Sequence, residues 1–180
     1  MILDHIAIRC KDRYVPAECF TSFLGYRHHT SFDLKFDDGS TTDCLVLVPG
    51  REYSGIPRVI TQTVAASLGD DGDFLVTADY QIPPEIFISD GPPESIVGKW
   101  VEKNGPGVHH LAFRVNPGEI ESYMTSHPTY EWLSKEPIVC DGLRQIFVKM
   151  PGTNLTIELI EREKEGFCRD SVKKLMESTK

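Results

Sequence analysis

The stretch Leu3–Arg9, which reads LDHIAIR, recurs as Val108–Arg114, which reads VHHLAFR. The histidines at positions 5 and 110 are 110 − 5 = 105 residues apart, and the same offset relates every position of the two segments. A histidine, an alanine and an arginine therefore stand at alternate positions of both. Alternate residues of a β-strand share one face. The repeat thus predicts two equivalent modules, in which His5 and His110 point toward a shared space.

The composition is that of a globular chain with an acidic surface. Its 180 residues suffice for one domain or for two small units that share a core. A net charge of −8 argues against nucleic acid or an anionic membrane as the main partner. We see no apolar run of about 20 residues and no signal peptide. Five scattered cysteines without a CxxC pair predict reduced thiols in the cytoplasm.

The first part of the chain reads as strand, helix and further strands. Tyr14–Leu24 has helical spacing, and Gly25 follows its end. Gly and Pro residues interrupt the region 50–83, which we interpret as a long excursion that includes a candidate strand at Asp73–Tyr80. The other strands are expected at 3–10, 26–36, 41–48 and 84–89.

The second part repeats this order. A strand is expected at 108–115, a helix at 117–126, and strands at 130–140, 143–150 and 155–160. An apolar stripe from Ile96 to Val101 predicts a helix between the two parts. The expected boundaries are a first module at 1–90 with an insertion at about 50–83, a linker helix at 91–107, a second module at 108–162 and a helical tail at 163–180.

Strand parity selects the candidate metal ligands. We expect a helix to cover the apolar face that His109 shares, which leaves His5 and His110 facing a cavity. His109 itself is expected to be a structural residue or to support the neighbouring ligand. Glu158 lies on the cavity face of the last strand, and Glu85 has a similar place in the first module. Two imidazoles with one or two carboxylates suit Fe(II), Mn, Co, Ni or Zn, and the absence of a cysteine ligand argues against a structural zinc.

The order of these motifs resembles the vicinal oxygen chelate superfamily, which includes glyoxalase I, extradiol dioxygenases, bleomycin and fosfomycin resistance proteins and methylmalonyl-CoA epimerase. Within it, the epimerases are the most similar in motifs. The segments that carry the resemblance are Leu3–Ile8, Phe20–Tyr26, Ser95–Val101, Gly107–Phe113 and Ile157–Leu159. The resemblance implies an α+β fold in which two βαβββ modules form an open mixed β-sheet barrel around a divalent metal.

The same resemblance assigns roles to residues. It places the metal ligands at His5, His110 and Glu158, with Glu85 as the fourth. It places a catalytic base on the third strand of the first module, where Asp43 is the nearest match. Glu85, Asp43 and Glu158 are therefore the candidate catalytic groups. The excursion at 50–83 and the tail have no counterpart in the short epimerases.

These residues predict a metal-dependent enzyme that moves a proton at a carbon next to a carbonyl, as an epimerase or a glyoxalase-like isomerase or lyase does. The substrate would be a small molecule such as an acyl thioester. A non-haem Fe(II) dioxygenase is the first alternative, and it gains if Glu85 is not a ligand. A non-catalytic small-molecule binding or resistance protein is the second. The sequence leaves open whether the cavity closes within one chain or across a homodimer.

Overall fold

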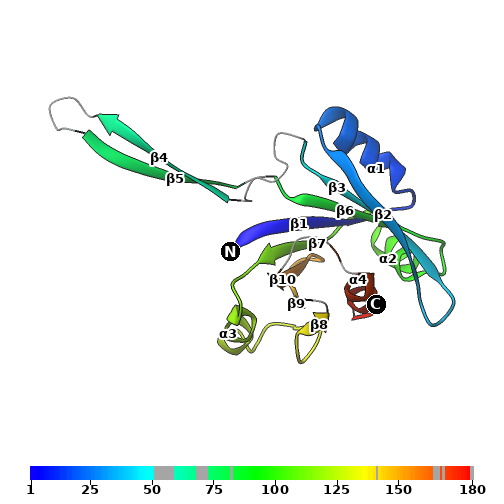
Figure 1. Cartoon of the computed structure of the whole chain (residues 1–180). Helices are drawn as coiled ribbons and strands as arrows, with labels where there is room; N and C mark the ends of the chain where they lie inside the picture. Colours follow the sequence, from blue (N-terminus) through cyan, green and yellow to red (C-terminus); the bar gives the residue numbers. More distant parts are fainter. Residues whose placement is uncertain are drawn as a thin grey trace.

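A computed structural model describes residues 1–50, 59–67, 73–81, 83–140, 142–163, 167 and 169–178. Its main element is an eight-stranded mixed sheet in the order β2-β3-β6-β1-β7-β10-β9-β8, which curls into a half-barrel (Figure 1). The α+β open barrel predicted from the sequence is confirmed.

The first module follows the predicted order. A helix is expected at 14–24, and the structure forms it in two parts, α1 and a π-helical segment η1. The elements are β1 (Ile2–Arg9), α1 (Tyr14–Glu18), η1 (Cys19–Phe23), β2 (Arg27–Lys35), β3 (Thr41–Val48) and β6 (Glu85–Asp90).

The second module repeats this order as β7 (Gly107–Arg114), α3 (Glu119–Ser126), β8 (Ile138–Cys140), β9 (Leu143–Lys149) and β10 (Thr156–Arg162). The strand expected at 130–140 forms only at its end. Pro137 just before it cannot donate a backbone hydrogen bond to a ladder, and the segment ahead of it keeps an isolated bridge between Trp132 and Val148.

The two modules meet along the middle of the sheet. β1 and β7 pair antiparallel there. Each of these strands also pairs, in parallel, with the last strand of its own module, β6 for β1 and β10 for β7. The histidine-bearing strands are therefore neighbours, and each has the carboxylate-bearing strand of its module on its other side.

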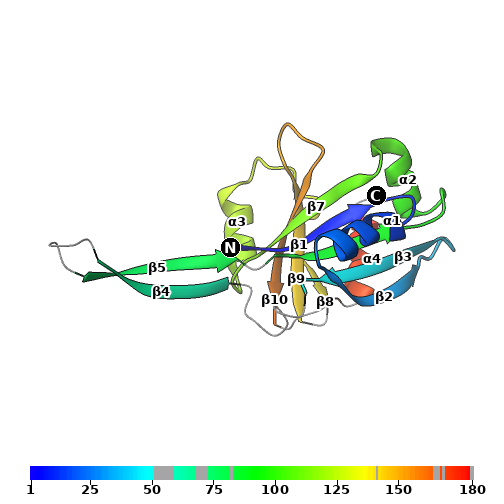
Figure 2. The ribbon, with the colours of Figure 1, turned by 90° about the horizontal axis from the view of Figure 1, so that it is seen from above.

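The insertion of the first module contains a hairpin. β4 (Val59–Ser67) and β5 (Asp73–Gln81) pair antiparallel as a separate two-stranded sheet, which projects away from the main sheet in both views (Figures 1 and 2). The strand expected at 73–80 is β5, whereas β4 was not expected. Residues 51–58, 68–72 and 82 of the predicted excursion lie outside the described residues.

The two faces of the sheet are covered by different helices. On the outer face, Ala17 of α1 packs on the first module and Ile120 of α3 packs on the second. On the inner face, α2 (Ile96–Asn104) and α4 (Arg169–Ser178) pack against β1, β3 and β6 through a shared apolar cluster. The inner face between the two modules is therefore lined by the linker helix and by the tail.

No helix among the described residues is long and apolar enough to cross a membrane. The four cysteines in the described part of the chain are Cys10, Cys19, Cys44 and Cys140, and all four are free thiols.

Gly98 offers a test of how closely α2 approaches the preceding turn. A Cβ atom at this position would overlap the backbone carbonyl of Pro92. Helix propensity favours Ala over Gly by about 1 kcal/mol, but we expect the overlap to outweigh it, so that Gly98→Ala lowers the free energy of unfolding by about 1–3 kcal/mol. Urea denaturation measures this. Glu102→Ala on the exposed face of α2 is the control, and a stabilised Gly98→Ala protein would contradict the packing described.

Candidate metal centre

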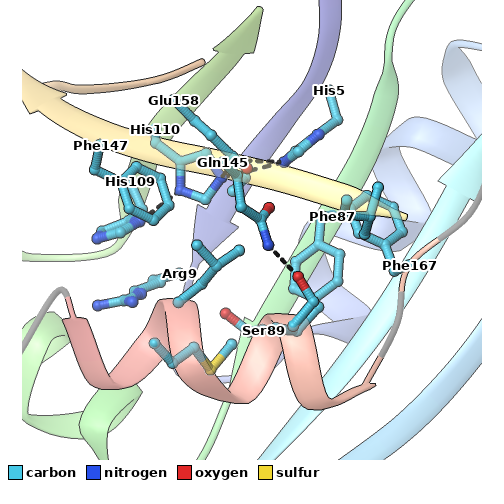
Figure 3. A pocket seen from close by; sticks show the side chains of 16 residues that line it. His5, Arg9, Phe87, Ser89, His109, His110, Gln145, Phe147, Glu158 and Phe167 are labelled. Atoms are coloured by element: carbon cyan, nitrogen blue, oxygen red, sulfur yellow. Dashed lines mark hydrogen bonds and ion pairs between the residues drawn. The ribbon is translucent and has the colours of Figure 1, made fainter. Parts of the chain in front are cut away.

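Three side chains from three adjacent strands converge at the centre of the inner face. His5 comes from β1, His110 from β7 and Glu158 from β10 (Figure 3). Their ligand atoms all lie within 4.8 Å of one another. The Nε2 atoms of the two histidines are 3.2 Å apart. Oε2 of Glu158 lies 3.3 Å from the Nε2 of His5 and 3.1 Å from that of His110.

These separations fit a shared divalent cation. Ligands bound at about 2.1 Å lie about 3.0 Å apart at octahedral angles and about 3.4 Å apart at tetrahedral angles. Glu158 has no exposed surface, and its carboxylate is paired with the rings of His5 and His110. Buried charges of this kind are paired or bound to a metal. Two imidazole nitrogens and a carboxylate oxygen suit Fe, Mn, Co, Ni or Zn.

The protonation states of the metal-free centre are set by burial and by mutual contact. Burial alone would lower the pKa of His5, but its contacts with Asp4 and Glu158 outweigh this effect and raise the pKa to about 9. Burial would raise the pKa of Glu158, but the neighbouring His110 and His5 lower it to about 2. The pKa of His110 is lowered, chiefly by burial. An imidazolium at His5 therefore balances the Glu158 carboxylate when no metal is bound.

The second ring nitrogen of each histidine is held by the residue that precedes it in sequence. The Oδ1 atom of Asp4 lies 2.9 Å from the Nδ1 atom of His5. The Nδ1 atom of His109 lies 2.8 Å from that of His110. The register of the β1–β7 pair shifts at both of these preceding residues. One shift lies between Leu3 and His5, at Asp4, and the other lies opposite the step from Ala7 to Ile8, at His109.

These register shifts correct one expectation. We expected His109 to face the covering helix, away from the cavity. Instead it lines the cavity beside His110, because a β-bulge adds an unpaired residue and turns its side chain out of the regular alternation. His109 is 4% exposed, and burial, together with the charges of Arg9 and His110, strongly lowers its pKa.

Glu85 does not join His5, His110 and Glu158. Sheet register explains why, because paired residues of parallel strands point to the same face. In the second module, Glu158 pairs with Ala112. In the first module, Ala7 is the residue equivalent to Ala112, and it pairs with Phe87. Glu85 pairs with His5 instead. Glu85 is thus two residues, or about 7 Å, away from the place that matches Glu158. It is half-buried and does not line the cavity.

Asp43, the candidate base, lies outside the cavity as well. It pairs with Asp90 in the β3–β6 ladder, on the face opposite to that of the cavity residues Phe87 and Ser89. Its carboxylate lies 3.3 Å from Arg13 and is 47% exposed. Of the five predicted site residues, the structure therefore brings together His5, His110 and Glu158, and leaves Glu85 and Asp43 apart from them.

The cavity wall includes residues of the C-terminal tail. The ring of Phe167 lies 5.0 Å from the rings of both His5 and Phe87. Ser171 of α4 accepts a hydrogen bond from the side chain of Gln145. The cavity that remains has a volume of about 30 Å³, enough for one or two water molecules.

Asp4 and Phe167 are the neighbours of the centre that sequence reasoning missed. The repeat carried a signal for Asp4, because Asp4 and His109 both stand immediately before a histidine at the same offset of 105. For His109 the expected structural or supporting role agrees with its place beside His110, whereas the expected face is wrong because of the bulge. Phe167 had no signal, since its contact with His5 joins distant parts of the chain.

Several solved structures have a fold similar to that of this chain. A variant of methylmalonyl-CoA epimerase from Streptomyces coelicolor, in complex with 2-nitronate-propionyl-CoA, is 20% identical, with a TM-score of 0.55; the match covers 91% of this chain and 99% of that one. The epimerase of Mycobacterium tuberculosis is 19% identical, with a TM-score of 0.53, and 90% and 88% of the chains are covered.

This chain shares its fold with methylmalonyl-CoA epimerases of known structure. A hypothetical protein from Bacillus halodurans shares it, with 16% identity, a TM-score of 0.56, and 92% and 97% of the chains covered. No family model matches the sequence, and no curated protein matches it. The vicinal oxygen chelate resemblance expected from the motifs is thus confirmed at the level of the fold.

The coupled pKa shifts of His5 and Glu158 predict how the metal-free protein responds to pH. The pKa of His5 rises from 6.5 to about 9 on folding, so its stabilisation is full below pH 6.5 and is lost as the pH rises through 9. The pKa of Glu158 falls from 4.5 to about 2, so its stabilisation is full above pH 4.5 and is lost as the pH falls toward 2.

We therefore expect the urea midpoint of the metal-free protein to fall between pH 6.5 and 9. In His5→Asn this fall should be much smaller, because the titrating imidazole is absent. Chelator-treated samples at each pH measure both. An equal fall in the two proteins would show that another group is responsible.

Proposed function

We propose that this protein is a divalent-metal-dependent enzyme of the vicinal oxygen chelate type, with His5, His110 and Glu158 as the metal ligands. One observation carries the proposal: three metal-binding atoms lie within 4.8 Å of one another, at the centre of the sheet. A bound cation would stabilise a carboxylate that has no exposed surface, because burial of a charge away from water costs free energy.

The bound metal would supply Lewis acidity toward two oxygen atoms of a substrate. The chain itself supplies the surroundings of that substrate. Arg9 is 3% exposed and lines the cavity, so its guanidinium can receive an anionic group. Gln145, Ser89 and Ser171 add polar groups to an otherwise apolar wall. A small, oxygen-rich and anionic substrate suits these residues.

A set of three protein ligands favours a reaction with molecular oxygen. Two histidines and one carboxylate with open positions are typical of non-haem Fe(II) oxygenases. The place that matches Glu158 in the first module holds Phe87, whose side chain cannot bind a metal. Among the described residues, no carboxylate besides Glu158 lines the cavity. We therefore infer that a non-haem Fe(II) dioxygenase is the reaction class that the local geometry supports best.

Proton transfer next to a carbonyl is the second candidate, and a second cavity favours it. This cavity has a volume of about 640 Å³ and shares His109 with the metal cavity. Lys99, Lys103 and Lys149 line it, and such cations suit the phosphates of an acyl thioester carrier. One solved epimerase of this fold holds methylmalonyl-CoA. Because Glu85 and Asp43 lie elsewhere, Glu158 would carry the proton in this reaction.

Two further features concern the cellular compartment and the oligomeric state. Free thiols fit a reducing compartment, so we propose the cytoplasm. All three ligands belong to one chain, so a homodimer is not required to complete the centre.

Metal binding tests the ligand assignment. We expect His110→Ala and Glu158→Gln to weaken binding of Co²⁺ or Fe²⁺ more than about 100-fold, beyond the usual effect of a supporting residue. Glu85→Gln and Asp43→Asn should bind as the unchanged protein does, because neither side chain lies at the centre. Isothermal titration measures all four. Loss of binding in Glu85→Gln would restore the four-ligand interpretation.

The reaction class is decided by running two assays on one metal-loaded protein. With Fe²⁺, uptake of dissolved oxygen with substrates that carry adjacent oxygen atoms supports the dioxygenase. With Co²⁺, exchange of deuterium from solvent into acyl thioesters supports proton transfer. His5→Ala should abolish either signal. Ligand binding that persists in His5→Ala without turnover would instead support a non-catalytic binding protein.

A further inference from the structure

We propose that Asp4 and His109 are a matched pair of positioning residues, which fix the ring orientation and tautomer of His5 and His110 and make the two histidines unequal metal donors. The inference rests on the proposed metal centre and deepens it. Neither residue would touch the metal, and each would act through the histidine that follows it.

The backbone places both residues for this role. In a regular strand, the side chain before an inward-pointing histidine points outward. The register of the β1–β7 pair shifts once at Asp4 and once at His109. These shifts occur at equivalent positions of the two modules, 105 residues apart. Two bulges at matching places indicate a built feature, because bulges commonly redirect a side chain beside a functional site.

The contacts leave one nitrogen of each ring available. Asp4 lies 2.9 Å from the Nδ1 of His5, and His109 lies 2.8 Å from the Nδ1 of His110. The Nε2 atoms are thereby turned toward Glu158, at 3.3 and 3.1 Å. A histidine that binds a metal through Nε2 donates its Nδ1–H to such a partner. The partner of His5 is a carboxylate, and the partner of His110 is an imidazole nitrogen.

Other side chains hold both partners in place. Asp4 has no exposed surface. Its carboxylate receives hydrogen bonds from Arg162, at 2.6 Å, and from Arg114, at 3.2 Å. The ring of His109 stands edge-on to that of Trp100, with centroids 5.3 Å apart. Both partners are therefore oriented by the fold itself.

The chemical difference between the partners has a consequence for the metal. A carboxylate draws the Nδ1 proton of His5 more strongly than a neutral imidazole draws that of His110, and so makes His5 the stronger donor. His110 becomes the weaker bond of the pair. The two modules thus share a backbone design but give the metal two different nitrogen ligands.

The experiment uses the full chain loaded with Co²⁺. Paramagnetic proton NMR in water detects the Nδ1–H of each metal-bound histidine as a shifted, exchangeable signal. The unchanged protein should show two signals of unequal shift and unequal solvent exchange. In Asp4→Asn we expect Co²⁺ affinity to fall about 10- to 100-fold, together with a moved His5 signal. His109→Leu should weaken affinity and broaden the His110 signal by exchange.

Two variants separate positioning from general stability. His109→Gln keeps an acceptor oxygen, so it should restore affinity and the second signal relative to His109→Leu. Asp90→Asn is a matched control for Asp4, since Asp90 is also a buried aspartate paired with an arginine, at 2.7 Å from Arg13. It should leave both signals and the Co²⁺ affinity unchanged.

The outcomes are distinct. If the unchanged protein binds no Co²⁺, the proposed metal centre fails and this inference fails with it. If the protein binds Co²⁺ but His109→Leu keeps the same affinity and both signals, the positioning role alone is overturned. The His109 variants decide this without Asp4, because His109 forms no ion pair with the residues that the structure describes.

Discussion

A carboxylate without exposed surface, placed among imidazoles, is the constraint on which the centre of this structure depends. Glu158 stands on β10 at the middle of the sheet, and burial of its charge would be prohibitive without His5 and His110 beside it. The histidines are held in turn by Asp4 and His109. The polar interior is therefore one connected network, in which each group satisfies the next, and the apolar clusters on either side of the sheet surround it.

Most of the predictions from the sequence rested on the alternation of side chains along β-strands. A repeat with a constant offset indicated two modules, and parity selected the faces of His5, His110 and Glu158. Parity assumes an uninterrupted ladder, so it failed at His109, where a bulge adds one residue. No sequence pattern distinguishes a bulged strand of this composition from a regular one, because the pairing of two distant segments decides where the extra residue falls.

The register of the first module was harder still. An insertion separates β6 from β3, so counting residues could not decide which position of β6 lies opposite Ala7. The structure places Phe87 there, and Glu85 lies two residues away. The tail presented the same difficulty. Its helix was predictable from apolar spacing, but the contact between Phe167 and His5 depends on packing across the finished sheet.

The position of β1 has a consequence for how the chain folds during synthesis. β1 precedes both of its partners, β6 and β7, so His5 waits for at least 85 − 5 = 80 further residues. Glu158 follows His5 by 153 residues, which a ribosome adds in roughly 8 to 30 seconds at about 5 to 20 residues per second. The nascent chain thus carries β1 without a sheet partner until β6 has been made, and the three residues of the proposed metal centre come together only after the second module has emerged.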